Sequence, residues 1–408
     1  MDENTPYIEV KKCRCCGSDN LTSVLDMADM PLANGFHMGE VQAKFPLEMM
    51  VCKNCFHGQL SVVVSGKIMF ANYAYMSSVS NTFRDHCEGL VADATSRVAA
   101  KPRVLDIAAN DGLLLSIFKQ KADATVLGVD PADNLKPYTD KLEIPMVHAF
   151  WSEKLAKSLN RKFDIITAQN VFGHVHDLKD FLKGCDAALD DDGIAIIEFA
   201  YSMDLVLKNE FDTIYHEHLS YFLINSFATL VKGTDFFIDD IIKTPIHGGS
   251  VRFVLKKKPG RNAPIVNKLI EIERQNGLFD MSTYEQFRAN VGQNRQAFRK
   301  LVAELQDKNE RVIGYCASAK GITMLNYFDI DLDYIVDDTE LKQGRLIPGK
   351  DTPIVKPEVL AQEKRRENMN IVVLAWNFMD EIKQRIQSIR GSKDTLLLYV
   401  PTVEKISL

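Results

Sequence analysis

Four cysteines near the start of the chain constrain its folding more than any other feature. Cys13 and Cys16 form one Cys-x-x-Cys pair, Cys52 and Cys55 form a second, and 35 residues separate the two pairs. Two such pairs supply four thiolates in tetrahedral geometry, which suits Zn²⁺ and lets a segment with a small core fold around the metal. Because four thiolates leave no open position for water, we expect a structural zinc site in a module that holds a lid. Cys15 offers an alternative ligand, and a redox couple would need only one of the pairs.

Length and composition limit the class of protein. At 408 residues the chain is longer than one hydrophobic core supports, and its 46% apolar and 25% charged residues are typical of a globular protein. The net charge of -6 argues against nucleic acid as a partner, because duplex binding needs a basic face. The N-terminus M-D-E-N-T-P lacks the pattern of a signal peptide, and the apolar runs are too short to span a bilayer. We therefore expect a cytoplasmic protein that binds neither nucleic acid nor membrane.

The middle of the chain carries a strand, a tight turn of small residues and a helix in direct succession. Residues 103–107 form a short apolar strand, A-A-N-D-G follows, and L-L-L-S-I-F then has helical spacing. This order presents backbone N–H groups to a ligand at the helix N-terminus. The turn has Ala108 and Ala109 where glycines are usual, which weakens a dinucleotide-binding interpretation.

Further strands continue this pattern. The segment A-T-V-L-G-V-D ends at Asp130, 24 residues after Asp106, and an acidic residue at that point can accept both ribose hydroxyls of an adenosine. Residues 163–168 and 194–199 are also predicted strands, and the helical stretch 178–189 separates them. This alternation predicts a parallel, doubly wound sheet and hence an α/β fold class.

Titratable side chains are densest in residues 212–222, which read D-T-I-Y-H-E-H-L-S-Y-F. Groups of this kind move protons near neutral pH, where the unperturbed pKa of histidine lies. The alternative interpretation is a polar loop or helix cap whose histidines are structural. A second loop, Q-N-V-F-G-H-V-H-D at 169–177, follows the C-terminal end of a predicted strand, where ligands of open α/β sheets bind.

The C-terminal third repeats the strand, turn and helix plan of the middle. Residues 284–305 place apolar side chains at helical spacing and predict an amphipathic connector. Residues 312–321 then read V-I-G-Y-C-A-S-A-K-G, in which Ser318 and Lys320 lie at a helix N-terminus that can take a phosphate. A merely structural Rossmann-like domain is the alternative.

Several motifs together carry a family resemblance. Beside the zinc module, the motifs concerned are Y-A-Y-M-S-S, V-L-D-I-A-A-N-D-G, G-V-D-P, Q-N-V-F-G-H-V-H-D, Y-H-E-H-L-S-Y-F and H-G-G-S-V-R. With them the chain resembles the S-adenosylmethionine-dependent C-methyltransferases that act on nucleotide-linked keto sugars. The resemblance covers nearly the whole chain. It implies a Rossmann-like methyltransferase core with an N-terminal zinc-binding module and a second C-terminal Rossmann-like α/β domain. The expected parts are the zinc-binding module 1–80, the methyltransferase domain 81–260, a helical connector 261–309 and a nucleotide-sugar-binding domain 310–408.

The resemblance also implies which residues hold the methyl donor and the substrate. S-adenosylmethionine is expected at the strand ends of the core, with the ribose on the acidic residue after the second strand: Asp106, Ala108, Asn110, Asp111, Gly112, Asp130, Pro131, Gln169 and Asn170. The substrate is expected at residues from all three parts: Tyr73, His247, Arg252, Ser318, Lys320 and Asn377.

Catalytic roles follow from the same match. Methylation of carbon requires removal of a proton alpha to a carbonyl, so the enzyme needs a base and donors for the enolate oxygen. His218 is the expected base, and Glu217 and Tyr215 are expected beside the sugar. His174 is expected to hold the substrate's oxygen.

The expected reaction is C-methylation of a nucleotide-diphosphate keto sugar, as in deoxysugar biosynthesis, by a monomer or weak homodimer. One of Tyr73 and Tyr75 would close the site from the zinc module, and Tyr75 is favoured. The alternatives are an O-methyltransferase, a C-methyltransferase of a non-sugar acceptor, and a non-catalytic binding module with a methyltransferase fold.

Overall fold

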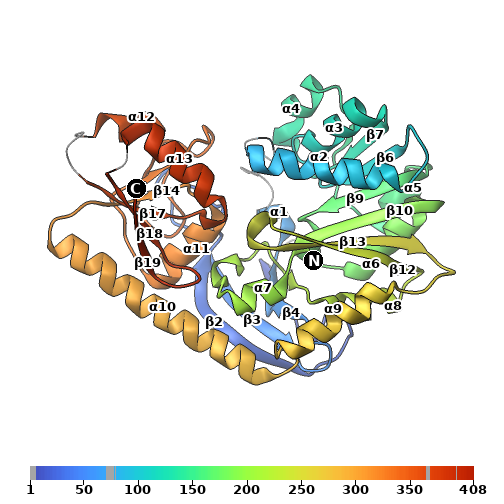
Figure 1. Cartoon of the computed structure of the whole chain (residues 1–408), viewed down its shortest axis with the longest axis horizontal. Coiled ribbons are helices and arrows are strands. Elements are labelled where there is room, and N and C mark those ends of the chain that lie inside the picture. Colours follow the sequence, from blue (N-terminus) through green and yellow to red (C-terminus); the bar gives the residue numbers. More distant parts are fainter. Residues whose placement is uncertain (1–5, 70–77, 79, 364–367, 392) are drawn as a thin grey trace.

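Two large sheets and a smaller N-terminal module organise the chain (Figure 1). The computed structural model describes residues 6–69, 78, 80–363, 368–391 and 393–408. A small β module, a seven-stranded sheet and a six-stranded sheet follow one another, which confirms the predicted α/β class with two Rossmann-like units. Among the described residues no helix has the length and apolar content needed to cross a membrane.

The N-terminal module is closed by a strand from the middle of the chain. Its elements and that strand are β1 (Tyr7–Glu9), β2 (Leu21–Pro31), β3 (Lys44–Cys52), β4 (Gly58–Leu60), β5 (Val62–Val64), α1 (Gly66–Met69) and β11 (Ser220–Tyr221). The sheet order is β11-β4-β3-β2, and β1 pairs separately with β5. Tyr221 lies opposite Gly58, where an added Cβ would lie 2.7 Å from Met49 and 3.0 Å from Tyr221. The glycine therefore lets the central segment approach the module closely.

The central sheet is parallel except for one strand. Its order is β12-β13-β10-β9-β6-β7-β8, and β13 runs antiparallel to both of its neighbours. The strands are β6 (Arg103–Ile107), β7 (Thr125–Val129), β8 (Met146–Val147), β9 (Phe163–Gln169), β10 (Leu189–Ala200), β12 (Phe236–Thr244) and β13 (Ser250–Lys257). The parallel strands thus direct their C-terminal ends to one edge, where the turn after β6 and the loop after β9 meet.

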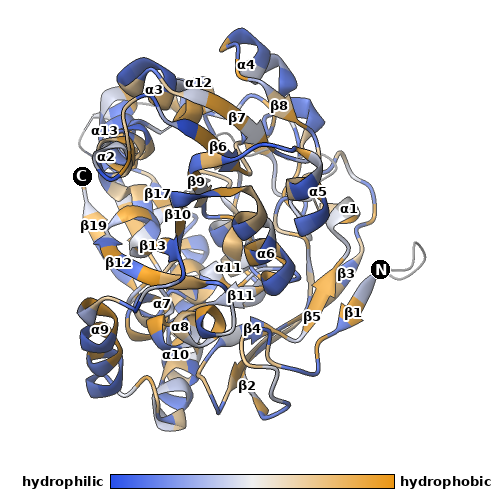
Figure 2. Cartoon of the chain, turned by 90° about the vertical axis from the view of Figure 1, so that its right-hand side faces the viewer, coloured by the Kyte–Doolittle hydropathy of each residue, from blue (hydrophilic) through white to orange (hydrophobic). Residues whose placement is uncertain are grey.

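Helices cover both faces of this sheet: α2 (Asn81–Ser96), α3 (Leu113–Ala122), α4 (Lys136–Lys141), α5 (Glu153–Ser158), α6 (Leu178–Ala188), α7 (Ser202–Leu207) and α8 (Ile224–Lys232). On β6, Val104 belongs to one apolar cluster with Phe118 of α3, whereas Leu105 belongs to another with Phe181 of α6. Successive strand residues therefore pack on opposite faces. Figure 2 shows the outer helices α4 and α5 as mostly hydrophilic and many strands as mostly hydrophobic.

Two helices lead from the central sheet to the C-terminal sheet. They are α9 (Pro264–Gln275) and the long α10 (Met281–Asp307), which runs along the lower edge of Figure 1. The apolar stripe of α10 is buried at Phe287, Val291 and Phe298, as its helical spacing predicts.

The C-terminal sheet has the order β16-β15-β14-β17-β18-β19 and is parallel except for its last strand. Its strands are β14 (Val312–Tyr315), β15 (Ile335–Val336), β16 (Ile354–Val355), β17 (Asn370–Val373), β18 (Thr395–Leu398) and β19 (Glu404–Ser407). Its helices are α11 (Ala319–Phe328), α12 (Pro357–Gln362) and α13 (Met379–Arg390). The N-terminus of α11 points at the same region as the C-terminal edge of the central sheet, because residues of both line one cavity.

Candidate active site

The two cysteine pairs meet at one point in the N-terminal module. The sulfurs of Cys13, Cys16, Cys52 and Cys55 all lie within 4.8 Å of one another, and the Cys13–Cys55 and Cys16–Cys52 Sγ distances are 3.6 Å. A tetrahedral Zn²⁺ about 2.3 Å from each sulfur holds neighbouring sulfurs about 3.8 Å apart, so the four side chains fit this metal. Cys15 is buried and lies outside the group. The cluster uses all four positions for protein thiolates and is therefore structural.

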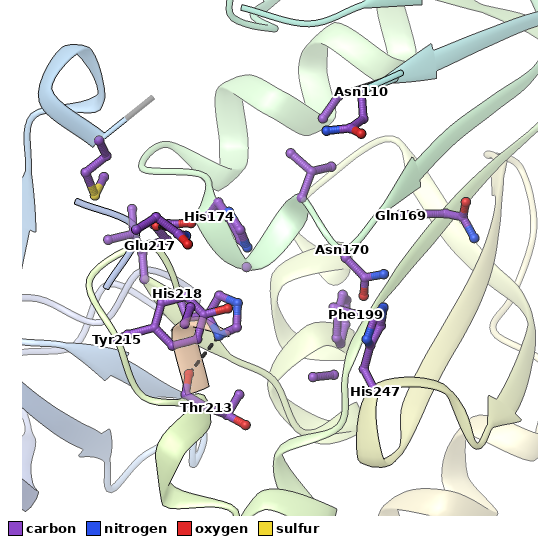
Figure 3. Close-up of a pocket in the computed structure, with 18 of the residues that line it drawn as sticks. Asn110, Gln169, Asn170, His174, Phe199, Thr213, Tyr215, Glu217, His218 and His247 are labelled. Carbon is purple, nitrogen blue, oxygen red and sulfur yellow. Dashed lines mark hydrogen bonds between the residues drawn. The ribbon is translucent and has the colours of Figure 1, made fainter. Parts of the chain in front are cut away.

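A cavity of about 1290 Å³ lies where the three parts of the chain meet (Figure 3). Most of the predicted site residues line it: Ala108, Asn110, Asp130, Pro131, Gln169, Asn170, His174, Tyr215, Glu217, His218, His247, Ser318, Lys320 and Asn377. Four predicted residues stand outside its lining: Asp106, Asp111, Gly112 and Arg252. Tyr73 and Tyr75 lie outside the described residues.

The turn after β6 consists largely of residues with positive φ. Ala108, Asn110 and Gly112 have φ values of 61°, 52° and 82°, in the left-handed region that favours glycine. Ala109 packs against Gly128 of β7, where an added Cβ would lie 2.9 Å from the Ala109 Cβ. The chain thus forms a turn of the glycine type with Ala108 and Asn110 in left-handed conformations, and Gly128 leaves space for the Ala109 side chain between them.

Two carboxylates organise this turn in different ways. Asp130, directly after β7, lines the cavity and accepts the backbone N–H groups of Asn110 at 2.9 Å and Ala132 at 2.8 Å. A carboxylate at this strand end fits the ribose of S-adenosylmethionine. Asp106 is buried and accepts the hydroxyl of Thr167 at 2.7 Å, and burial raises its pKa to about 7. Asp106 therefore supports the turn from behind the cavity wall.

Of the other residues predicted to bind S-adenosylmethionine, some line the cavity and others support its wall. Gln169 and Asn170 end β9 on the cavity wall (Figure 3). Asp111 accepts the backbone N–H of Ser78 at 2.8 Å and so ties the turn to the segment before α2. Gly112 is the N-cap of α3.

His218 presents one ring nitrogen for chemistry. Its Nδ1 donates a hydrogen bond to the carbonyl oxygen of Thr213 at 2.7 Å, which places the lone pair of the neutral ring on Nε2 (Figure 3). The ring of Tyr215 lies 3.9 Å from that of His218, and the ring of His174 lies 4.9 Å from it. Burial lowers the pKa of His218 well below its ordinary value, and His174 adds to the effect. The ring is therefore neutral near pH 7 and able to accept a proton.

The neighbours of His218 in sequence face two different environments. Glu217 lines the cavity, and Asn34 of the zinc module donates its Nδ2 to Glu217 Oε1 at 2.6 Å. Burial raises the pKa of Glu217 to about 7. His216 is directed away, and its Nε2 donates to the Phe45 carbonyl at 3.1 Å in the zinc module.

His247 and Arg252 occupy different places. His247 lines the cavity in the left-handed conformation, with φ of 57°, and its ring lies 5.7 Å from that of Phe83. Arg252 is buried in β13, where its Nε donates to Glu198 at 2.8 Å, and His86 lies 2.6 Å from the other Glu198 oxygen. Arg252 therefore belongs to an internal ion-pair network that joins β10, β13 and α2.

The C-terminal domain supplies the third wall with Ser318, Lys320 and Asn377. The Ser318 hydroxyl caps α11 by accepting the N–H of Gly321 at 3.1 Å, and it donates to the carbonyl of Leu374, directly after β17, at 2.7 Å. Lys320 lies 4.3 Å above the ring of Trp376 and donates to the carbonyl of His247 at 3.3 Å. Lys320 lines the cavity and acts electrostatically on the nearby carboxyl groups of Glu210 and Asp212, although among the described residues it forms no ion pair within 4 Å.

The C-terminal domain repeats the carboxylate arrangement of the methyl-donor side. Asp337 follows β15 and accepts the N–H groups of Ala317 at 2.7 Å and Thr339 at 2.8 Å. Asp130 makes the same pair of contacts, to the turn after the first strand and to the residue two positions later. Cys316, which precedes Ala317, has φ of 71° and repeats the left-handed turn of the central domain. Each Rossmann-like unit therefore places on the wall of one cavity a carboxylate that accepts the same pair of backbone N–H groups, an arrangement that we call a carboxylate cradle.

Several wall residues were not predicted as site residues: Asn34, Glu210, Asp337, Lys342 and Arg385. The sequence contained a signal for Asp337, because D-Y-I-V-D-D places an acidic residue after a strand as G-V-D-P does. Asn34 lies in A-N-G-F, which has the composition of an ordinary turn and carried no such signal.

Comparison with known proteins places these parts in one family. Family models match a putative zinc-binding domain at 13–70, a methyltransferase domain at 83–240 and a C-methyltransferase C-terminal domain at 245–401. The C-methyltransferase NovU of Streptomyces niveus is 28% identical over 412 residues, covering 98% of this chain and 97% of that protein.

Other similarities cover only part of the chain. The ubiquinone biosynthesis O-methyltransferase of Rhodopseudomonas palustris is 34% identical over 99 residues, which are 23% of this chain and 38% of that protein. The structure of the ribosomal protein L11 methylase from Lactobacillus delbrueckii covers 44% of this chain and 80% of its own, with 18% identity and a TM-score of 0.32. The last similarity is too distant to support an argument.

The three family matches follow the order in which the zinc cluster, the donor side of the cavity and its C-terminal wall occur in the chain. The full-length similarity to a C-methyltransferase agrees with that order. The chain therefore belongs to the C-methyltransferase family that joins a zinc-binding domain, a methyltransferase domain and a C-methyltransferase C-terminal domain, and it is an S-adenosylmethionine-dependent C-methyltransferase.

Proposed function

We propose that the chain methylates the carbon next to the ketone of a nucleotide-linked keto sugar, by enolisation followed by methyl transfer. The observation that carries the proposal is a single cavity that extends from Asp130 past His218 to Asp337. It offers one carboxylate cradle for each of two nucleosides and a base between them. A methyl donor and a nucleotide-linked acceptor are two ligands of that kind.

His218 acts as the base in this proposal. A proton leaves the alpha carbon and binds to Nε2, and the electron pair of the broken C–H bond forms the enolate. The Thr213 carbonyl holds Nδ1–H at 2.7 Å, so it also stabilises the imidazolium that forms. Burial lowers the pKa of His218, and the negative charge of the enolate opposes that effect at the moment of transfer.

Groups beside His218 donate hydrogen bonds that stabilise the negative charge developing on the ketone oxygen. Glu217, whose pKa is raised to about 7 by burial, is substantially protonated at neutral pH and can donate a hydrogen bond. Burial lowers the pKa of His174 to about 4, so its neutral ring can donate one N–H. A donor of this kind contributes about 10²- to 10³-fold to the rate when it faces the oxyanion.

S-adenosylmethionine supplies the electrophilic methyl group when it binds at the cradle of Asp130. The cavity walls align the enolate carbon with that methyl group and exclude water, which converts the encounter into an effectively unimolecular step. As the enolate carbon bonds to the methyl group, the bond between methyl and sulfur would break and leave its electron pair on sulfur. His218 holds the proton lost by the carbon until the products leave. Its release to solvent returns the ring to the neutral form.

The C-terminal wall suits the charge of a nucleoside diphosphate. Lys320, Lys342 and Arg385 all line this part of the cavity. Lys342 lies 3.3 Å from Asp337 and Arg385 lies 3.1 Å from Asp338, whereas Lys320 has no carboxylate within 4 Å among the described residues. We therefore assign the diphosphate to the surroundings of Lys320, at the N-terminus of α11.

Proton exchange in heavy water tests the proposal. The wild-type protein is incubated with a panel of nucleoside-diphosphate keto sugars, without methyl donor, and the alpha protons are followed by NMR. We expect exchange with at least one acceptor, no exchange with His218→Ala, and a methylated carbon when donor is added. Absence of both exchange and product across the panel would favour a non-sugar acceptor, and exchange that persists in His218→Ala would assign the base to another residue.

A further inference from the structure

Asp212 is a buried carboxylate at the start of the histidine-bearing segment. It lies in the short helix η4 (Phe211–Thr213) and is 0% exposed. Its Oδ2 accepts two hydrogen bonds, from Nε1 of Trp376 at 2.7 Å and from the hydroxyl of Tyr399 at 2.7 Å. Both donors belong to the C-terminal domain, where they follow β17 and β18. The carboxylate thus fastens the catalytic segment to another domain.

The hydrogen bonds of this carboxyl group are incomplete. Burial raises its pKa, whereas Lys320, Tyr399 and Trp376 act to lower it. Its second oxygen, Oδ1, has no hydrogen-bond partner among the described residues. Replacement of a buried charge by apolar side chains of similar volume is often neutral or stabilising, so a packed interface does not require one.

The residue after Asp212 orients His218. Thr213 follows Asp212 directly, and its carbonyl oxygen accepts Nδ1–H of His218 (Figure 3). This hydrogen bond selects the tautomer with the lone pair on Nε2 and fixes the plane of the ring. A shift of the Asp212 backbone would therefore displace the neighbouring carbonyl that holds the ring.

Trp376 connects the same carboxylate to the cavity wall. Its ring lies 4.3 Å from Nζ of Lys320, and the two residues that follow it, Asn377 and Phe378, line the cavity. The indole N–H points the other way, to Asp212. One side chain therefore touches both the C-terminal wall and the support of the catalytic segment.

We propose that Asp212 is a positioning residue through which the C-terminal domain sets the tautomer and orientation of His218. The inference rests on the proposed function, in which His218 removes the proton. It gives the C-terminal domain a part in the chemical step in addition to binding the acceptor. It also gives a reason for a carboxyl group at a buried interface.

Two substitutions and one control test this role. Asp212→Asn keeps the shape and replaces the carboxyl group by an amide, and Trp376→Phe removes one donor and provides a second variant if the first does not fold. Tyr334→Phe is the control, because Tyr334 lies in the same domain, donates to Glu363 at 3.0 Å and does not line the cavity. We expect kcat to fall about tenfold or more in both test variants, since each removes or weakens a buried hydrogen bond between Asp212 and the C-terminal domain. KM for both substrates should change less than about threefold, and the control should match wild type.

The ring nitrogens of His218 give a second readout that needs no acceptor. NMR of protein with isotope-labelled histidine distinguishes the two tautomers, and His218→Gln identifies the signal. Wild type should carry the proton on Nδ1, and both test variants should show a larger share of the other tautomer. Unchanged His218 signals in both variants would overturn the inference, whatever happens to kcat. If the signals respond but wild type acts on no keto sugar, the proposed function fails and the positioning role stands.

Discussion

Glu217→Gln tests whether burial raises the pKa of the Glu217 carboxyl group. Burial raises the pKa of Glu217 from an ordinary value of 4.5 to about 7. A carboxyl whose folded pKa lies above its unfolded pKa binds its proton more tightly in the folded state, so folding loses stability as pH rises through that window. The difference between 4.5 and 7 corresponds to about 3 kcal/mol at pH 8, because one pKa unit is about 1.4 kcal/mol. At pH 5 the same relation leaves a cost below about 1 kcal/mol.

The glutamine variant keeps the shape of the side chain and can still accept the hydrogen bond from Asn34. Because the glutamine cannot ionise, the stability of the variant should not show the loss that ionisation of Glu217 causes in the wild type as pH rises. We expect its midpoint of thermal unfolding to lie within about 2 °C of wild type at pH 5 and about 6 °C above wild type at pH 8.

Thermal unfolding followed by intrinsic fluorescence at both pH values is the assay. Glu285→Gln is the matched control, because Glu285 lies on the exposed face of α10. It should show no difference between the two pH values relative to wild type. A Glu217→Gln difference that stays constant with pH, or that favours wild type at pH 8, would refute the reasoning.

Three further substitutions and one metal-removal experiment complete the predictions. His218→Ala should lower turnover at least about 100-fold with unchanged donor affinity by calorimetry, and a drop of tenfold or less would point to another base. Asp130→Ala should weaken donor binding in the same titration, since it removes the ribose acceptor, and unchanged affinity would contradict that role. Asn34→Ala removes a hydrogen bond that lowers the pKa of Glu217, so the loss of stability should extend further above pH 7 in a pH series of unfolding curves. Chelation of the metal should unfold the N-terminal module by circular dichroism and lower activity indirectly, whereas full activity after verified metal loss would exclude this structural role.

Features that depend on local order were predictable from the sequence. The metal cluster could be predicted because two of its ligands lie three positions apart in each Cys-x-x-Cys pair. Asp130 could be predicted because it directly follows a strand. Ala108 illustrates the limit of residue-type rules, because the turn keeps its left-handed geometry without a glycine at that position.

Contacts between distant segments were not predictable in this way. Asn34 reaches Glu217 across 183 positions, and its direction depends on how the zinc module docks on the core. Arg252 was expected to face the substrate, but its partner Glu198 is 54 positions away on the neighbouring strand and holds it inside the sheet. A side chain on a strand faces one side or the other by register, and register is set by the partner strand.

The catalytic segment 212–222 is held by contacts to the zinc module and to the C-terminal domain. These contacts explain how a structural metal can matter for catalysis. Its strand β11 pairs with β4, which begins three residues after the second cysteine pair, and His216 donates to the carbonyl of Phe45 in the same module. Asp212 fastens its other end to the C-terminal domain. Loss of the metal would free β4 and hence β11, so His218 would lose its place relative to the cavity although no metal ligand touches it. Activity is therefore expected to depend on zinc through the geometry of this segment, with kcat more sensitive than donor affinity, because the donor cradle belongs to the central sheet.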